Sequence, residues 1–187
     1  AMRQFGYPVG PLALLDEVGI DVGVHVSRVL GPLFAGRGVQ ADEAMETLFK
    51  AGYKGRKNNR GFYLYDPSGR GRKKDVNEEV YAFFGGPKRV SIGDAEIQKR
   101  LSLVMMNEAA YCLQEGILSS PRDGDIGAVF GLGFPPYLGG PFRYIDRLGP
   151  RKILAMMEDI ENIHGNRFKP AGILRDMAAE NKRFYAG

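Results

Sequence analysis

The stretch that decides the fold is Gly6-Tyr7-Pro8-Val9-Gly10-Pro11-Leu12-Ala13-Leu14-Leu15-Asp16-Glu17-Val18-Gly19. A second copy begins at Gly133-Phe134-Pro135 and continues as Gly140-Pro141-Phe142-Arg143-Tyr144-Ile145-Asp146-Arg147-Leu148-Gly149. Both copies follow one pattern: glycine, an aromatic residue, proline, a spacer, Gly-Pro, four residues, aspartate, two residues and glycine. The spacer is three residues longer in the second copy. Such a match in one order indicates a duplicated supersecondary unit.

Each copy predicts a short helix with a defined start and end. Gly10 and Gly140 can serve as N-caps, and the proline after each suits the first helical position, where the backbone needs no N–H. Gly19 and Gly149 then supply a left-handed stop. The two copies therefore predict the same turn followed by the same short helix.

Apolar periodicity and capping residues predict further helices along the chain. These helices cover residues 21–35, 41–51, 76–84, 94–114, 123–130, 150–163 and 170–181. The region 94–114 carries the longest apolar stripe, with Ser91 and Asp94 spaced as a capping box ahead of it. Gly61-Phe62-Tyr63-Leu64-Tyr65 is the one good strand pattern. The sequence predicts an all-α fold with one short extended segment.

The two copies differ in what precedes them. A helical region at 94–116 lies ahead of the second Gly-aromatic-Pro turn, and nothing comparable lies ahead of the first. By symmetry, we expect two repeats of one helical unit, the first lacking its leading helix. We predict a first repeat at 1–65, a basic linker with a bridging helix at 66–90, and a complete second repeat at 91–187.

Composition limits the chemistry that the chain can perform. Its 187 residues are 44% hydrophobic and 26% charged, which is ordinary for a domain with a real core. No window of 18 apolar residues occurs, so no transmembrane segment is expected. The single Cys112 excludes an internal disulfide framework and a cysteine-based zinc site. With only His25 and His164 besides, we predict no catalytic, cofactor-binding or metal-binding residue within the chain.

Several polar patterns favour structural roles. Gly36-Arg37-Gly38-Val39-Gln40-Ala41 matches the G-x-G-x-x-A dinucleotide pattern, yet a predicted helix precedes it where that pattern needs a strand. Asp123 and Asp125 suit N-capping better than metal binding. Asp16 and Asp146 recur at one repeat position, and we expect them to hold backbone amides rather than to act as acid–base groups.

Positive charge is concentrated in one stretch. Residues 54–74 carry eight bases and one acid, which gives +7, and the rest of the chain carries −3. This stretch suits a solvated loop or a contact with phosphate. Its mixture of bases and aromatic residues also occurs in nucleic-acid binders. Because no RNA-binding motif accompanies it and no broad basic face is expected, we predict no nucleic-acid partner and keep RNA binding as a minor hypothesis.

The motifs together resemble a known family. They are Gly6-Tyr7-Pro8-Val9-Gly10-Pro11, Gly55-Arg56-Lys57 with Gly61-Phe62-Tyr63-Leu64-Tyr65, Asn107-Glu108-Ala109, Asp125-Ile126-Gly127-Ala128-Val129-Phe130-Gly131 with Leu132-Gly133-Phe134-Pro135-Pro136, and Gly139-Gly140-Pro141-Phe142. The chain resembles the C-terminal region of L-3-hydroxyacyl-CoA dehydrogenases. Because it has two copies, it is most similar to the α subunits of multifunctional fatty-acid β-oxidation complexes. The resemblance covers nearly the whole chain.

The resemblance implies that the reactive groups lie elsewhere. Such enzymes carry an enoyl-CoA hydratase domain, then a Rossmann domain that binds NAD and holds the catalytic His and Glu, then the duplicated helical region. An Asn that binds substrate lies on the leading helix of the first copy, and Lys99 takes that position in the second. The resemblance therefore implies that NAD binds the parent enzyme and not this chain, and that the chain alone is inactive.

Five residues are predicted to contact the acyl-CoA substrate of the parent enzyme. They are Pro8, Val9, Gly10 and Pro11 of the first turn, followed by Phe130, which stands where some family members carry Tyr. A turn rich in glycine and proline offers a rigid apolar surface with little conformational entropy to lose on binding. The resemblance thus places this chain at the acyl side of the dehydrogenase cleft.

An alternative assigns the chain a docking role without any contribution to catalysis. Its partners would be the Rossmann and hydratase domains of the same chain, or the thiolase β subunit of the complex. The resemblance implies a bacterial cytoplasmic location, with the mitochondrial matrix or the peroxisome as the alternative.

Overall fold

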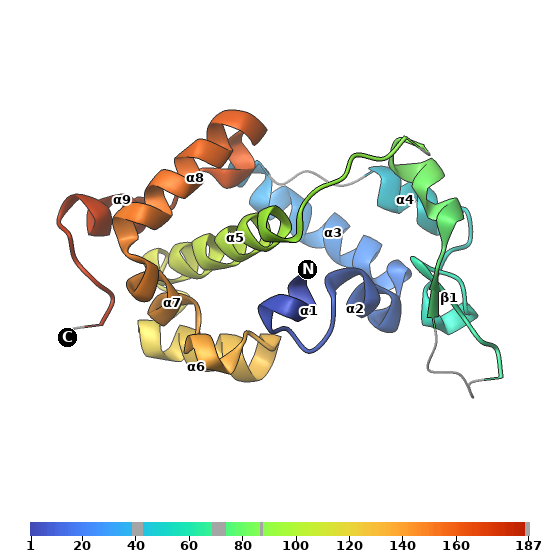
Figure 1. Ribbon diagram of the computed structural model, residues 1–187, viewed down its shortest axis with the longest axis horizontal. Helices are drawn as coiled ribbons and strands as arrows, with labels where there is room; N and C mark the ends of the chain where they lie inside the picture. Colours follow the sequence, from blue (N-terminus) through green and yellow to red (C-terminus); the bar gives the residue numbers. More distant parts are fainter. Residues whose placement is uncertain (39–42, 69–73, 87, 186–187) are drawn as a thin grey trace. The chain divides into compact units, whose positions relative to one another are not determined.

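A computed structural model describes residues 1–38, 43–68, 74–86 and 88–185. Most of these residues form helices, which confirms the predicted all-α class. The chain forms two compact units (Figure 1). One unit is Val9–Ser91, and the other joins Ala1–Pro8 to Ile92–Gly187. We call them the first and the second unit.

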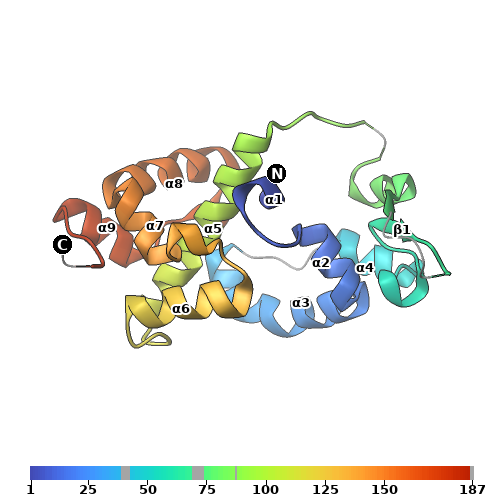
Figure 2. The same ribbon diagram turned by 60° about the horizontal axis from the view of Figure 1, so that its bottom comes forward.

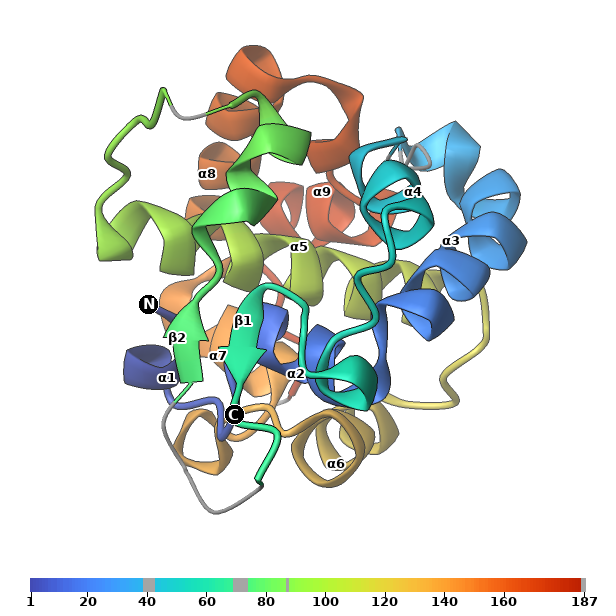
Figure 3. The same ribbon diagram turned by 90° about the vertical axis from the view of Figure 1, so that its right-hand side faces the viewer.

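The first unit is built from helices and one small sheet. Its elements are α2 (Pro11–Val18), α3 (Ile20–Phe34), η1 (Ala35–Arg37), α4 (Glu43–Lys50), η2 (Arg56–Asn58), β1 (Tyr63–Tyr65), β2 (Lys74–Val76) and η3 (Glu78–Phe84). Elements labelled η are 3-10 helices. The two strands pair antiparallel, with Tyr63 opposite Val76 (Figure 3). Its apolar core includes Ile20, Leu48 and Val80.

The second unit is organised around its longest helix. Its elements are α1 (Met2–Phe5), α5 (Asp94–Gln114), α6 (Pro121–Leu132), η4 (Pro136–Leu138), α7 (Pro141–Leu148), α8 (Pro150–His164), η5 (Asn166–Phe168) and α9 (Gly172–Ala179). Helix α5 contacts α6, α7, α8 and α9, and runs between α6 and α8 (Figures 1 and 2). Leu103 and Met106 of α5 are fully buried in the core, which includes Phe142 and Ile145 of α7.

The two predicted copies form matching pairs of helices. Helices α2 and α7 each have 8 residues and begin with proline after a glycine N-cap, as predicted from the Gly-Pro pairs. Helices α3 and α8 follow at once and each have 15 residues. The described residues of the first unit contain no helix equivalent to α5. The prediction of two repeats of one helical unit is confirmed by these matching pairs.

Two capping predictions need correction. Gly19 and Gly149 do have positive φ (110° and 94°), but their ψ values of 132° and 126° lie outside the left-handed helical region. This conformation turns the chain directly into the next helix, which begins one residue later. The predicted capping box ahead of residue 94 is also absent, because the N-cap of α5 is Gly93 and no side chain caps it.

The compact units divide the chain at different points from the predicted 1–65, 66–90 and 91–187. Residues 1–8 belong to the second unit, where the side chain of Gln98 donates to the carbonyl oxygen of Ala1 at 2.9 Å. Within the predicted linker, β2 pairs with β1 and Val80 of η3 is buried in the core of the first unit. Residues 69–73 and 87 of that linker, like residues 39–42 around the predicted start of α4, lie outside the described residues.

Two glycines let the chain pass very close to α2. A Cβ on Gly55, whose φ is +78°, would overlap the backbone carbonyl of Asp16, and a Cβ on Gly61 would overlap the Asp16 carboxylate. Glycine is required at Gly55 for both reasons, since other residues seldom adopt this φ. The close approach brings the segment before β1 against Asp16.

We predict that Gly55→Ala lowers the free energy of unfolding by about 3 kcal/mol or more, because the new methyl group meets a backbone atom and the φ is unfavourable. Gly127→Ala is the control, since Gly127 lies within α6 with no atom within 4 Å of an added Cβ. Alanine there should stabilise the helix by up to about 1 kcal/mol. Urea unfolding followed by circular dichroism measures both, and equal stabilities would contradict the prediction.

Candidate functional site

The carboxylate of Asp16 is completely buried and binds the backbone of a distant segment. Its Oδ1 accepts a hydrogen bond from the Phe62 amide at 3.0 Å, and its Oδ2 accepts from the Tyr63 amide at 2.9 Å. The hydroxyl of Tyr65 donates to the same Oδ2 at 2.9 Å. These donors offset the cost of burying a charge. The carboxylate therefore joins α2 to the segment that forms β1.

Asp146 makes the same pair of backbone contacts in the second unit. Its two oxygens accept hydrogen bonds from the amides of Phe184 and Tyr185, both at 2.9 Å. The prediction that the recurring aspartates hold backbone amides is confirmed in both copies. We call the two arrangements the Asp16 clamp and the Asp146 clamp.

A third buried carboxylate, that of Asp125, caps a helix other than its own. Asp125, on α6, accepts hydrogen bonds from the amides of Phe142 at 2.7 Å and Arg143 at 3.3 Å, which open α7. Tyr185 donates its hydroxyl to Asp125 at 2.6 Å. Burial raises the pKa of Asp125, and these hydrogen bonds partly oppose that effect. Asp125 is a cap as predicted, but of α7, while Ser120 is the N-cap of α6.

The tyrosines that donate to these carboxylates hold their protons firmly. Burial raises the pKa of Tyr65, and the negative charge of Asp16 that accepts its hydrogen bond raises it further. Burial and the Asp125 carboxylate act in the same way on Tyr185. Both hydroxyls are therefore donors at neutral pH, and the buried carboxylates serve the structure.

Sequence analysis missed the donors of the clamps, although a pattern pointed to them. The dipeptide Phe-Tyr occurs at 62–63 and again at 184–185. In each copy its two amides bind the aspartate of the repeat. Extending the search for repeats past the Gly-Pro helices would have found this pair.

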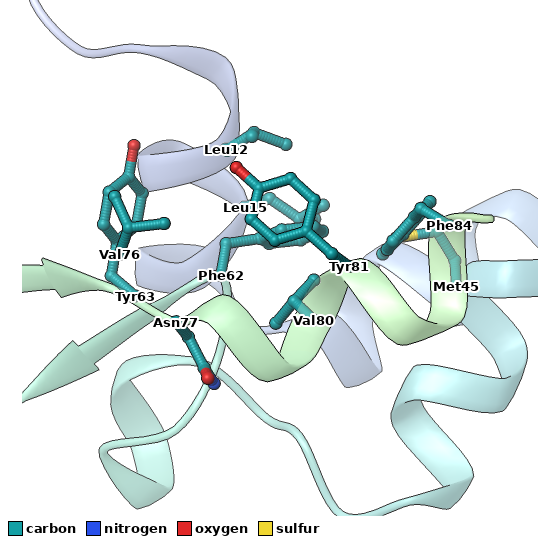
Figure 4. Close-up of a pocket in the computed structure, with 10 residues that line it drawn as sticks. All are labelled: Leu12, Leu15, Met45, Phe62, Tyr63, Val76, Asn77, Val80, Tyr81 and Phe84. Atoms are coloured by element: carbon teal, nitrogen blue, oxygen red, sulfur yellow. The ribbon is translucent and has the colours of Figure 1, made fainter. Parts of the chain in front are cut away.

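An apolar groove of about 390 Å³ opens within the first unit. Side chains from α2, α4, the β1–β2 pair and η3 gather around it (Figure 4). Its lining residues are Leu12, Leu15, Met45, Phe62, Tyr63, Val76, Asn77, Val80, Tyr81 and Phe84. None of these described residues is charged, and Asn77 uses its amide to bind the carbonyl of Gly61 at 2.9 Å. The groove offers apolar contact area.

The structure places the predicted substrate-contact residues in both units. Val9, Gly10 and Pro11 open the first unit, where Gly10 is the N-cap of α2 and Pro11 its first residue. Pro8 belongs to the second unit and packs by Gly133, where an added Cβ would lie 3.2 Å from the proline ring. Phe130, on α6 of the second unit, is 86% exposed. Their contact with substrate stays a prediction.

Phe130 borders a shallow, mixed depression of about 310 Å³. Asp125, Arg143 and Tyr185 line the same depression. Their polar groups are engaged with one another, since Tyr185 binds Asp125 and the Arg143 guanidinium stacks 4.1 Å above the Tyr185 ring. Phe130 therefore presents an apolar ring beside a polar cluster that holds α7 in place.

Three bases of the basic stretch pair with acids of their own unit. Arg56 pairs with Glu17 at 2.7 Å, and Lys57 pairs with Asp21 at 2.7 Å. Arg60 pairs with Glu79 at 2.6 Å. The bases at 70, 72 and 73 lie outside the described residues. These exposed pairs contribute little stability each, but they support a structural use of the stretch.

The dinucleotide-like pattern at 36–41 does not fit a cofactor site where the structure describes it. Gly36 and Gly38 follow α3 and η1, whereas a phosphate-binding glycine loop follows a strand. Residues 39–41 of the pattern lie outside the described residues. Within the described chain, no group of three or more His, Cys, Asp or Glu residues is placed to hold a metal ion.

The helices can also be compared with the length and composition that a membrane span requires. Across the described residues, no single helix is both long and apolar enough to cross a membrane. Only α2 and the helix from 20 to 37 pass by length and composition together, across a bend of 99°.

Comparison with known proteins gives a match to one family model and to curated relatives. Residues 1–65 match the model of the 3-hydroxyacyl-CoA dehydrogenase C-terminal domain. The fatty acid oxidation complex subunit alpha of Shewanella amazonensis is 50% identical over 99% of this chain, and that of Shewanella halifaxensis is 46% identical over 100%. The chain covers 26% of each relative, so it spans about a quarter of their length.

Solved structures share the fold at low sequence identity. The 3-hydroxybutyryl-CoA dehydrogenase of Escherichia coli matches with a TM-score of 0.68 and 20% identity, over 94% of this chain and 52% of that one. The dehydrogenase part of multifunctional enzyme 1 from C. elegans matches with a TM-score of 0.67 and 23% identity, over 94% of this chain and 40% of that one. At these identities the likeness shows the fold.

We predict that Asp16→Asn and Asp146→Asn loosen their own units separately. Asn presents an amide group where the carboxylate accepts, so each change should lower local stability by roughly 3 kcal/mol. Hydrogen exchange measured by NMR should show faster exchange of the Phe62 and Tyr63 amides in the first variant. The Phe184 and Tyr185 amides should change in the second.

Each variant is the control for the other. Unchanged exchange at the clamped amides, or the same loss of protection in both units from either change, would contradict the independent clamps.

Alkaline pH should weaken the first unit through Tyr65. The raised pKa means that folded Tyr65 keeps its proton while an unfolded tyrosine ionises near pH 10. Its contribution to stability is therefore present below about pH 10 and is lost as the pH rises further. Urea unfolding from about pH 9 to about pH 11 should show a smaller decline for Tyr65→Phe than for the unchanged chain. Equal declines would show that Tyr65 does not carry the effect.

Proposed function

We propose that this chain, whose residues 1–65 match the model of the 3-hydroxyacyl-CoA dehydrogenase C-terminal domain, forms the acyl-side wall of a dehydrogenase cleft in a longer fatty-acid β-oxidation enzyme. The observation that carries the proposal is the match of 1–65, because it includes the turn Pro8–Pro11. The relatives named as fatty acid oxidation complex subunits support the same assignment.

The reaction proposed for the longer enzyme oxidises an L-3-hydroxyacyl-CoA to the 3-ketoacyl-CoA. A base takes the proton of the 3-hydroxyl while C3 gives a hydride to NAD. The buried carboxylates Asp16, Asp125 and Asp146 are engaged in holding backbone and tyrosine hydroxyls. We therefore assign the base and the NAD site to a Rossmann domain outside this chain, and hydratase activity to a further domain.

The proposed contribution of this chain is a rigid apolar boundary. Gly10 is the N-cap of α2, and the Asp16 clamp fixes that same helix from its other end. Val9 and Pro11 are exposed on a short segment at the start of this helix. Such a surface binds an acyl chain at a small entropic cost.

A docking role is the second candidate, and exposed apolar side chains favour it. Val18, Val29 and Leu33 on α2 and α3 are all exposed. In this alternative the chain binds the other domains of the enzyme, or the thiolase β subunit of a complex, without contacting substrate. The relatives' designation as subunits alpha supports a partner subunit.

Reconstitution distinguishes the two candidates. The purified chain should not consume NADH when acetoacetyl-CoA is supplied. Addition of the part of the Shewanella amazonensis relative that lies N-terminal to the aligned region should restore consumption. Val9→Asp should lower the restored rate by about tenfold, because a carboxylate at the wall repels an apolar chain.

Ile163→Asp is the control, since Ile163 is an exposed apolar residue at the end of α8. Binding without restored activity would favour the docking role. NADH consumption by the purified chain alone would overturn the assignment of the reactive groups to another domain.

A further inference from the structure

We infer that Tyr137 is a positioning residue, which anchors the Gly6 turn (Gly6-Tyr7-Pro8) and thereby sets the affinity of the longer enzyme for its acyl-CoA substrate. The inference rests on the proposed function, since Pro8 is one of the residues predicted to contact substrate. It goes beyond that function because it assigns part of the affinity to a residue that acts only through others.

The hydroxyl of Tyr137 binds the backbone immediately before the Gly6 turn. It donates a hydrogen bond to the carbonyl oxygen of Phe5 at 2.5 Å. Tyr137 lies on η4, Phe5 is the last residue of α1, and both belong to the second unit. The contact joins residues 132 positions apart, so it fixes the chain at the residue that precedes Gly6.

The ring of Tyr137 lies against Gly6 itself. An added Cβ on Gly6 would lie 2.8 Å from Cε1 of Tyr137 and 2.9 Å from Cβ of Pro135. The φ of Gly6 is +117°, which other residues rarely adopt. Glycine is therefore required where the chain passes this closely, and the ring and the hydroxyl of Tyr137 act on adjoining residues.

The rest of the Gly6 turn packs on the residues that lead from α6 to η4. The rings of Tyr7 and Phe134 meet edge to face, with centroids 6.0 Å apart. Pro8 lies beside Gly133, the C-cap of α6, where an added Cβ would be 3.2 Å from the proline ring. Phe130, on the same helix, is the other predicted substrate contact of the second unit. One segment therefore supports both contacts.

Core packing makes this segment a firm support. Phe134 is completely buried and Leu138 is 6% exposed, in a core that also contains Ala128 of α6. The side chain of Tyr137, beside Leu138 in sequence, is 68% exposed. The buried neighbours thus fix η4, while Tyr137 remains at the surface and holds the turn.

A turn that is already held in place binds substrate better than a loose one. An ordered contact surface loses less conformational entropy when the ligand binds. Without the Tyr137 hydroxyl, the Phe5 carbonyl loses this partner and the Gly6 turn gains freedom, while the reacting atoms keep their surroundings. The expected result is a higher KM at an unchanged kcat, because the lost contribution is shared by bound substrate and transition state.

Steady-state kinetics of a chimera tests the effect on substrate. In the chimera, this chain replaces the region of the Shewanella amazonensis relative that aligns with it, and the remainder of that protein supplies the proposed reactive groups. Tyr137→Phe removes only the hydroxyl and should raise the KM for acetoacetyl-CoA about fivefold, with kcat within about twofold. Tyr137→Ala also removes the ring beside Gly6 and should raise the KM by about tenfold or more.

Tyr111→Phe is the matched control, because the Tyr111 hydroxyl also donates to a backbone carbonyl of the second unit, that of Lys169, at 3.3 Å. This variant should leave the KM unchanged. A purely structural role of Tyr137 would lower the amount of active enzyme, and therefore kcat at a constant KM. That result, or a KM that neither Tyr137 variant changes, would overturn the inference.

Hydrogen exchange of the 187-residue chain measures the turn without any substrate. The amides of Gly6 and Tyr7 donate to the Met2 carbonyl at 3.2 and 3.1 Å. Both amides should exchange faster in Tyr137→Phe, because the turn opens more often, and at the original rate in Tyr111→Phe. Unchanged exchange in Tyr137→Phe would mean that its hydroxyl does not hold the turn and would overturn the inference.

Val9→Asp separates a failure of this inference from a failure of the proposed function. If Val9→Asp slows the chimera while Tyr137→Phe leaves its KM unchanged, the wall stands and only the role of Tyr137 is wrong. If Val9→Asp has no effect on the rate, the proposed wall is wrong and the inference is wrong with it.

Discussion

The first unit depends on one buried charge. Asp16 removes a carboxylate from water, which is unfavourable unless donors replace the lost hydration. The Phe62 and Tyr63 amides and the Tyr65 hydroxyl supply three hydrogen bonds of 2.9 to 3.0 Å. Loss of any one donor would leave the buried charge less well compensated, so the contact favours a fold in which all three are in place. The glycines at 55 and 61 are the steric condition for this contact.

Repetition of the clamp explains why so few residues of the two copies need to match. The Gly-Pro start, the aspartate and the glycine at the end specify a helix and the point at which a later segment binds it. The rest of each copy is free to differ, as the β1–β2 pair of the first unit and α9 of the second show. The clamps bind segments 46 and 38 residues away, respectively.

Sequence reasoning succeeded where the physical cause is local. The helix predicted at 94–114 is observed as Asp94–Gln114, because a continuous apolar stripe and a glycine after its end decide its extent. Strand β2 was missed because Lys74–Val76 has no strand pattern and pairs only through β1. The cap on α7 was missed for the same kind of reason, since Asp125 lies on another helix.

In the candidate site, too, only the features with a local or repeated sequence pattern could be predicted. The role of Asp16 and Asp146 could be predicted from their recurrence, but the groove could not. Its lining comes from five separate elements, so only the folded chain brings Leu12, Met45 and Tyr81 to one place. The repeat then becomes informative in the opposite direction. Once the second copy shows which side chains α5 covers, their counterparts in the first copy can be compared with them position by position.

Corresponding positions in the two repeats are more informative about exposed apolar side chains than the first repeat is by itself. Single exposed apolar side chains are ordinary on protein surfaces and need no explanation. Tyr144, Leu148 and Met156 of the second repeat are partly buried against the core that contains Leu103 and Met106 of α5. Their counterparts in the first repeat, Leu14, Val18 and Val26, are 44% to 53% exposed. The two repeats therefore place one helix pair in two different surroundings.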